Sequence, residues 1–144
     1  MPQIQSIQVN INTLDVDGAG TDGSVYLGVC GREFKLDTTA DDFEQGSGRQ
    51  YVLGDGADVV NKGRNDPRKQ LLLTEHIAAF PVYLRFAGDD DEDHWGLARA
   101  IMTLNNDLLP MWDTQAWIPE DEGIWLGADC GNIAFLPLHE DPKG

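Results

Sequence analysis

Short apolar segments separated by turn residues recur along the whole 144-residue chain, and this spacing constrains the fold most strongly. Residues 7–11 alternate between apolar and polar, with Ile7, Val9 and Ile11 on one face, as in a half-buried strand. The segments SVYLGV, REFKL and RQYVL follow, so that four short strands fit into the first 53 residues. Strands at a spacing of roughly 8 to 12 residues, with little helix, predict an all-β fold, an antiparallel β-sandwich of two sheets.

The middle of the chain combines loop, turn and strand signals. Residues 54–69 are rich in Gly and Asn and are predicted to form a long loop. QLLL is expected to be a strand, and Thr74 is a plausible N-cap for one short helical turn, EHIAAF, that ends at Pro81. VYLRF alternates as a strand does. WGLARAIMTL could be helix or strand by its own residues, and its alanines favour a helix.

The C-terminal part is less regular than the rest. MWDTQAW, GIWLG and NIAFLPL are expected to be further short strands, separated by Pro119, Gly123 and Gly131. The full length, 1–144, is that of a single domain.

Charge limits the partners that this chain can have. The formal net charge is −15, which argues against direct binding to nucleic acid or to an anionic membrane. An anionic ligand would need a local basic surface or a bridging cation. The acidic residues form three clusters: Asp15, Asp17 and Asp22; Asp37, Asp41 and Asp42; and the unbroken run 89–93. Four of the ten basic residues lie in one loop, at Lys62, Arg64, Arg68 and Lys69.

Two further features concern the compartment. The sequence has no apolar run near the roughly 18 to 20 residues of a membrane-spanning helix, and its first residues do not resemble a signal peptide. A cytoplasmic protein is therefore expected from the sequence as written, unless it is a fragment of a secreted one. Cys30 and Cys130 match no metal or redox spacing and are predicted to be buried free thiols.

The loop DVDGAGTDG, residues 15–23, has three interpretations. A calcium-hand loop would need oxygen ligands at its fifth and twelfth positions, which are Ala19 and Tyr26. A dinucleotide-binding loop would open a helix after Gly23, whereas SVYLGV is typical of a strand. A tight turn between strands remains. Because loops gather at the ends of a sandwich, its carboxylates could share one cation with another acidic loop.

Three motifs in this order resemble those of the PLAT domain, the lipoxygenase-homology β-sandwich. The motifs are A-G-T-D at residues 19–22, D-x-x-x-[ND]-D-F-x-x-G-S at residues 37–47, and W-x-L at residues 95–97. The resemblance covers about residues 5–104 and leaves 105–144 as an extension with further strands. It also implies that WGLARAIM is a strand, with Trp95, Leu97 and Ile101 as core positions.

The resemblance implies a non-catalytic sandwich of two four-stranded sheets that binds a lipid surface or a protein. Toxin-type members of the family bind membranes through calcium, with ligands from three loops. Matched position by position, the ligands here would be Gly20, Thr21 and Asp22; Asp37, the carbonyl of Ala40, Asp41 and Asp42; and Asp90 or Asp91. Asp41 replaces an Asn of the toxin pattern and keeps an oxygen. Thr38 replaces another Asn and weakens that position.

Three functions are therefore compared. The first is calcium-mediated attachment to a lipid surface or protein partner, and the second is calcium-independent protein–protein interaction, with Asp37 and Asp42 merely capping turns. A small hydrolase is a distant third, because no serine lies in G-x-S-x-G and no histidines form H-E-x-x-H. We expect no catalytic residues.

Candidate contact residues for a membrane or partner are few. Trp112 and Trp117 could be apolar loop tips, although large aromatics at such positions more often lie in the core. Lys62 and Arg64 could touch lipid headgroups.

Overall fold

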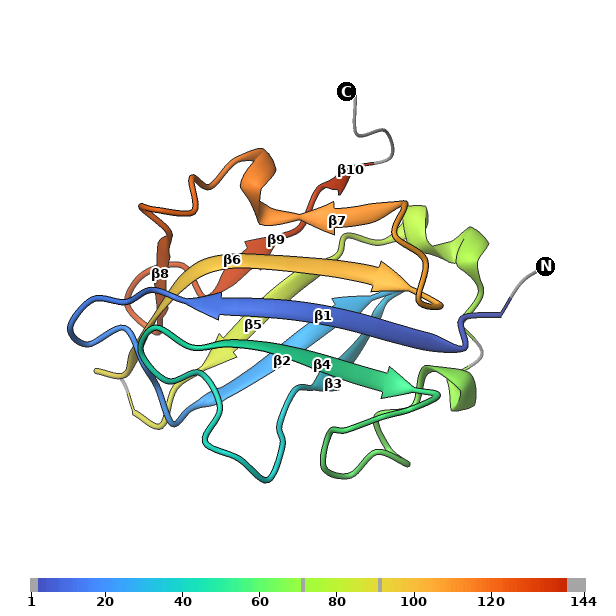
Figure 1. Cartoon of the computed structure of the whole chain (residues 1–144), viewed down its shortest axis with the longest axis horizontal. Helices are drawn as coiled ribbons and strands as arrows, with labels where there is room; N and C mark the ends of the chain where they lie inside the picture. The colour runs from blue at the N-terminus through green and yellow to red at the C-terminus, as the bar shows by residue number, and fades with distance from the viewer. Residues whose placement is uncertain (1–2, 71, 91, 140–144) are drawn as a thin grey trace.

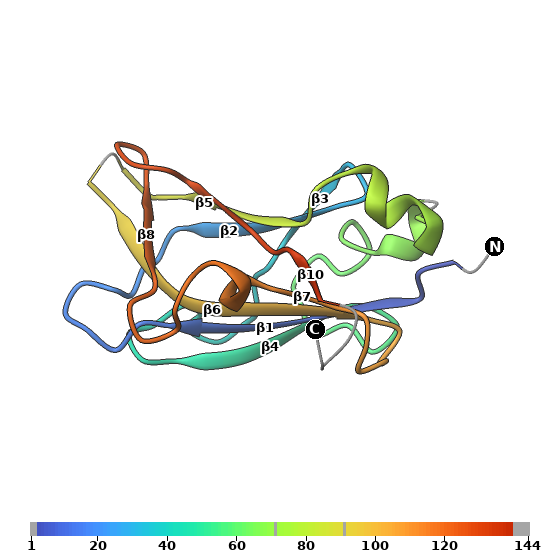
Figure 2. The ribbon, with the colours of Figure 1, turned by 90° about the horizontal axis from the view of Figure 1, so that it is seen from above.

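Two antiparallel sheets pack face to face in the computed structural model, which describes residues 3–70, 72–90 and 92–139 (Figures 1 and 2). One sheet has the order β10-β7-β6-β1-β4, with β8 also paired to β6, and the other has the order β3-β2-β5-β9. The predicted all-β sandwich is confirmed, but the sheet of β1 has six strands and not the four that the resemblance implies, because β7, β8 and β10 extend it. The strands are β1 (Ser6–Thr13), β2 (Ser24–Val29), β3 (Arg32–Lys35), β4 (Gly48–Gly54), β5 (Tyr83–Ala87), β6 (His94–Leu104), β7 (Met111–Asp113), β8 (Ile124–Gly127), β9 (Ile133–Phe135) and β10 (Leu138–His139).

The central strand β1 follows the alternation in its sequence. Ile7, Val9 and Ile11 are buried in the main core, as predicted, because one face of β1 packs against the opposite sheet. β1 pairs with β4 on one side and with β6 on the other. The four predicted strands of the first 53 residues are therefore all present.

The long strand β6 contains a β-bulge that the sequence pattern does not reveal. It is a strand, as the PLAT resemblance implies, and not the helix that the alanines favour. Trp95 and Leu97 are buried as expected, but the pairing with β1 skips Ala98, and the extra residue reverses the facing of the rest of the strand. Ala100, Met102 and Leu104 then face the core, and the prediction of Ile101 as a core position is wrong.

In the part of the chain that the structure describes, helical structure is limited to short 3₁₀ segments: η1 (Pro67–Lys69), η2 (Thr74–Ala79) and η3 (Thr114–Ala116). The predicted helical turn is confirmed as η2. Thr74 is the first residue of η2 and Leu73 occupies the N-cap position, so the prediction of Thr74 as N-cap is wrong. QLLL is not a strand in its described residues, because only an isolated bridge joins Leu73 to Gln3.

The segment after residue 104 joins both sheets. β7, β8 and β10 extend the sheet of β1, whereas β9 extends the sheet of β5. MWDTQAW is a strand only as far as Asp113, whose carboxylate accepts a hydrogen bond from the backbone N–H of Gln115 and so caps η3. Trp112 is 5% exposed and belongs to the core, because β7 turns this ring inward, so the prediction that it is an apolar loop tip is wrong.

The cysteines and the membrane prediction are also tested. Cys30 and Cys130 are free thiols, as predicted, but only Cys30 is buried and Cys130 is exposed. In residues 3–70, 72–90 and 92–139, no helix has the length and hydropathy needed to cross a bilayer.

The topology gathers the acidic loops at one end of the sandwich, here named the acidic end. The β1–β2, β3–β4 and β5–β6 loops all lie there, on the left of Figure 1, because β1 runs toward this end while β4 and β6 start from it. The β8–β9 loop lies at the same end, since Gly127 pairs with His94. The loop that follows β4, with Lys62 and Arg64, begins at the opposite end and runs back to Asp37, whose carbonyl accepts a hydrogen bond from the Val60 N–H.

Candidate functional site

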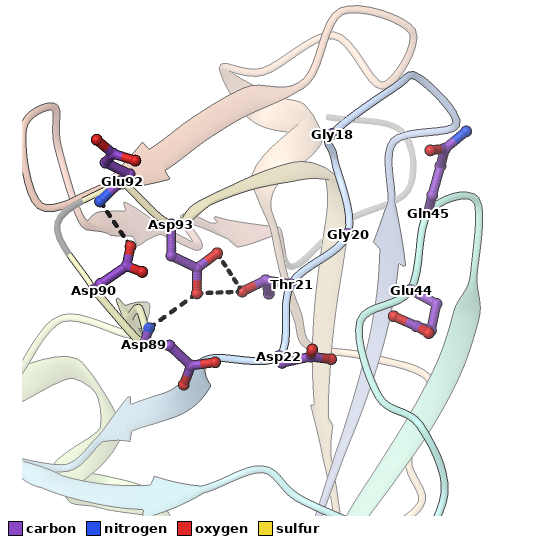
Figure 3. A pocket seen from close by; sticks show the side chains of 10 residues that line it. All are labelled: Gly18, Gly20, Thr21, Asp22, Glu44, Gln45, Asp89, Asp90, Glu92 and Asp93. Carbon is purple, nitrogen blue, oxygen red and sulfur yellow. Dashed lines mark hydrogen bonds between the residues drawn. The ribbon is translucent and has the colours of Figure 1, made fainter.

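Thr21 is the point at which three loops of the acidic end meet. Its side chain is buried, and its hydroxyl donates to the Asp93 carboxylate, 2.8 Å from each oxygen (Figure 3). The same hydroxyl oxygen accepts a hydrogen bond from the Gly23 N–H at 2.9 Å. The Thr21 N–H donates to the carbonyl of Phe43 at 3.0 Å. One residue of the β1–β2 loop therefore holds both the β3–β4 and the β5–β6 loops.

The β3–β4 loop has a rigid attachment to the core. The buried ring of Phe43 stacks on Tyr51 and contacts Trp95 edge-on, with centroid distances of 5.4 and 5.3 Å. Gly20 lets the β1–β2 loop approach this loop closely, because a Cβ at Gly20 would lie 2.8 Å from the backbone nitrogen of Gln45. The glycine of the A-G-T-D motif is therefore explained by loop packing.

Two acidic hollows open on either side of Thr21 and Asp22. The first acidic hollow lies between the β1–β2 and β5–β6 loops and is shown in Figure 3. None of its described lining residues is basic. Its acidic lining residues are Asp22, Glu44, Asp89, Asp90, Glu92 and Asp93. Asp93 is already hydrogen-bonded, to Thr21 and to the Asp89 N–H, whereas Asp22 and Asp90 are exposed.

The second acidic hollow lies between the β1–β2 and β3–β4 loops. Thr21 and Asp22 line it too, together with Asp37, Ala40, Asp41 and Asp42. The Asp42 carboxylate is held in place by the Thr38 N–H and hydroxyl, each at 2.8 Å, and by the Tyr51 hydroxyl at 3.0 Å. Thr38, which weakened the sequence match, thus orients a candidate ligand.

The electrostatics of the second hollow are those of crowded carboxylates. Burial, and then the neighbouring Asp42 carboxylate, raise the pKa of Asp37, while Lys35 partly offsets the effect. Burial and the same Asp42 carboxylate also raise the pKa of Tyr51. Two carboxylates that face each other favour a bound proton or cation. The ligand atoms around them are carboxylate, carbonyl and hydroxyl oxygens, the set that calcium prefers, but two cations also lie close: Lys35 lines the hollow, and Arg49 pairs with Asp42 at 3.5 Å.

The structure brings most of the candidate ligands together. Gly20, Thr21, Asp22, Asp37, Ala40, Asp41, Asp42 and Asp90 all line one or both hollows. Asp91 lies outside the described residues. The basic residues Lys62 and Arg64 line neither hollow, although their loop contacts the second one, where the Val60 N–H donates to the carbonyl of Asp37 at 2.8 Å. Trp117 is 46% exposed, beside η3, and its indole N–H donates to the carbonyl of Phe135.

The sequence reasoning missed Asp93. It chose Asp90 or Asp91 from the acidic run, but Asp93, one residue before β6, is the one that reaches Thr21. No sequence signal separates Asp93 from its acidic neighbours, because its contact with Thr21 joins two loops that are far apart in the chain. Tyr51 was also missed, since its hydroxyl contact with Asp42 joins residues of two different segments.

Comparison with known proteins gives similarity of fold. No family model matches the sequence, and no curated protein matches it. The structure resembles alpha-toxin from Clostridium absonum (TM-score 0.61, 20% identity), over 94% of this chain and 32% of the toxin. It also resembles the alpha-toxin of an avian strain of Clostridium perfringens, with a TM-score of 0.61 and 19% identity. This match covers 92% of this chain and 31% of the toxin.

A third similar structure is coral 8R-lipoxygenase, described as activated by calcium via a C2-like domain (TM-score 0.57, 21% identity). The match covers 92% of this chain and 17% of the lipoxygenase. This chain therefore spans about a third of the toxins and about a sixth of the lipoxygenase. The match extends well beyond residue 104, in agreement with the pairing of β7–β10 into both sheets. The chain has the PLAT-like β-sandwich fold that its sequence motifs resemble.

Proposed function

We propose that this chain is a non-catalytic module that binds calcium at its acidic end and attaches through calcium to a lipid surface. The observation that carries the proposal is the sharing of Thr21 and Asp22 by two acidic hollows built from three loops. The calcium activation described for the coral lipoxygenase, through a domain of similar fold, supports the same function.

The ligands would come mainly from the second hollow. Calcium takes six to eight oxygens, and the side chains of Asp22, Asp37, Asp41 and Asp42 with the carbonyl of Ala40, joined by the carbonyl of Gly20 from the first hollow, supply such a set. The hydroxyl of Thr21 already bonds to Asp93 and to the Gly23 N–H, so Thr21 would position the loops. Asp90 would add a ligand from the first hollow, and Asp91, which lies outside the described residues, is the other candidate from the acidic run.

A lipid surface fits the charge of the chain only if a cation intervenes. With a net charge of −15, the protein is repelled by anionic headgroups, and calcium would bridge carboxylates to lipid phosphates. Val16, 47% exposed between Asp15 and Asp17, would offer an apolar side chain from the same β1–β2 loop. Lys62 and Arg64 would not share this contact, because they line neither hollow.

The test combines metal binding with membrane binding. Millimolar calcium should raise the melting temperature relative to chelator, since calcium binds the folded state alone, whereas equal concentrations of magnesium should do less. The protein should then sediment with phosphatidylserine vesicles in calcium and remain in solution in chelator. An unchanged melting curve and a flat calorimetric titration would remove calcium from the proposal.

The alternative is a calcium-independent protein-binding module, and one observation favours it. An apolar groove runs between η2 and the β9–β10 segment, where Phe80, Phe135 and Leu138 are each about half exposed. Exposed aromatic and aliphatic side chains that line one groove are typical of protein contacts. A melting temperature that calcium does not change, together with no sedimentation with vesicles in either calcium or chelator, would favour this alternative.

A further inference from the structure

Three side chains with different metal-binding atoms meet at the acidic end, outside the two hollows. His94 is the first residue of β6, and Asp129 and Cys130 belong to the β8–β9 loop. The imidazole nitrogen, carboxylate oxygen and thiol sulfur all lie within 4.8 Å of one another. His94 Nε2 is 2.5 Å from the Asp129 carboxylate. Among the described residues, these three form the one group of three or more His, Cys, Asp or Glu side chains whose ligand atoms are close enough together to bind a single metal ion.

The tautomer of His94 is suited to a metal ligand. Its Nδ1 lies 2.8 Å from the backbone carbonyl of Glu92, and a carbonyl only accepts, so Nδ1 carries a proton and donates it. Nε2 is thus the nitrogen that faces Asp129 and Cys130. Metal-bound histidines usually donate their other ring N–H to a carbonyl or carboxylate in this way, which fixes the ring orientation.

The backbone around the cluster is shaped to bring the three side chains together. Gly127 pairs with His94 in the β6–β8 ladder, and a Cβ at Gly127 would overlap the imidazole ring. The Gly127 N–H donates to the carbonyl of Gly131 at 3.1 Å and closes the loop that carries Asp129 and Cys130. The Cys130 sulfur lies 3.7 Å from the carbonyl of Trp125, which orients the thiol.

We propose that His94, Asp129 and Cys130 bind a zinc-type transition-metal ion, with solvent completing the coordination. Imidazole and thiolate ligands select zinc and related ions, whereas calcium selects oxygens. The site is therefore chemically distinct from the oxygen-lined hollows and does not depend on the proposed calcium function. Binding releases the thiol proton of Cys130 to solvent, and also the Nε2 proton of any His94 that is charged, with no electron transferred.

The electrostatics of the metal-free cluster agree with this assignment. The hydrogen bond to Asp129, and then that to the Glu92 carbonyl, raise the pKa of His94. Hydrogen bonding to His94 lowers the pKa of Asp129. The negative charge that now attracts a proton to Nε2 would equally attract a divalent cation. The bound ion would fasten the β8–β9 loop, which connects the two sheets, to the start of β6.

The test uses cobalt(II) as a spectroscopic probe on the full chain, with a non-chelating reductant present. We expect one cobalt ion per chain and a thiolate-to-cobalt charge-transfer band that zinc abolishes by displacement. Cys130→Ser should remove the band. His94→Gln and Asp129→Asn should weaken binding by more than about tenfold, since even the loss of a second-shell partner has that effect. His76→Gln, at an exposed histidine of η2, is the matched control and should leave the titration unchanged.

Two results would overturn the proposal. One is the absence of a charge-transfer band, or its persistence in Cys130→Ser, in protein whose circular dichroism matches the wild type. The other is loss of the cobalt spectrum in excess calcium, because that would place the ion in the oxygen-lined hollows. Failure of the calcium titration described above would leave this test unaffected, so the two proposals are distinguishable.

Discussion

Thr21→Val tests whether a single hydroxyl joins the loops of the acidic end. Valine has nearly the shape of threonine, so the change removes the hydroxyl and leaves the packing of this buried side chain almost intact. The Asp93 carboxylate then loses the donor that lies 2.8 Å from both of its oxygens, and keeps the Asp89 N–H. The Gly23 N–H loses its acceptor.

The expected loss of stability follows from the charge on Asp93. A hydrogen bond to a charged group contributes about 1.5 to 3 kcal/mol, and an N–H left unsatisfied adds to the loss. Because the loop is partly open to water, we expect a total near 2 to 3 kcal/mol in the free energy of unfolding. For a chain of this size, about 3 °C of melting temperature corresponds to each kcal/mol, so the melting temperature should fall by roughly 6 to 9 °C.

The assay is urea unfolding followed by circular dichroism, with chelator present so that no metal contributes. Thr103→Val is the matched control: the Thr103 hydroxyl lies 3.5 Å from the neutral amide oxygen of Gln8, and its loss should change stability by less than about 1 kcal/mol. If Thr21→Val remained within about 0.5 kcal/mol of the wild type, the junction at Thr21 would be refuted.

Three further predictions follow from single contacts. Trp112→Ala should reduce the free energy of unfolding by about 3 to 5 kcal/mol in urea, because it empties a core position, whereas Trp117→Ala, at an exposed ring, should have less than half that effect. In chelator, Asp37→Asn should raise the melting temperature slightly by removing repulsion from a neighbouring carboxylate, and should reduce the stabilisation by calcium. Burial opposes ionisation of Asp113, but hydrogen bonds from Arg99 and from a backbone N–H outweigh it, so its pKa is lowered. The stabilising contribution of Asp113 is present above the unfolded pKa of about 3.9 and is lost as the pH falls through the folded value. In Asp113→Asn, the free energy of unfolding should therefore fall less steeply as the pH is lowered through the acid range.

The elements that the sequence predicts well are those with a local cause. The alternation of Ile7, Val9 and Ile11 reflects one buried face, and the short strands with their turn residues lead directly to a sandwich. The bulge at Ala98 has no such local signal. Ala98 packs outside the main core against Leu14 and Ala19, and that contact exists only after the β1–β2 loop has folded over β6.

The candidate site also contains residues that the sequence predicted and residues that it could not. The A-G-T-D motif and the Asp-rich loop predicted residues that do line the hollows, because their spacing is set by two short turns. Within the run 89–93, neighbouring residues are nearly identical, so the sequence could not select Asp93 as the partner of Thr21. Trp112 is buried and Trp117 is exposed because β7 ends at Asp113, so the two rings are not on one alternating strand.

The most direct test of the central claim is a calcium titration of the isotopically labelled chain, followed by amide chemical shifts in nuclear magnetic resonance. We expect calcium to move the amide signals of residues 20–22 and 37–42 together, with one apparent affinity, and to leave those of η2 at the opposite end unchanged. Saturation in the β1–β2 and β3–β4 loops at the same calcium concentration would be the signature of one shared site. Spectra that do not change, or changes centred on the basic loop, would contradict calcium binding at the acidic end.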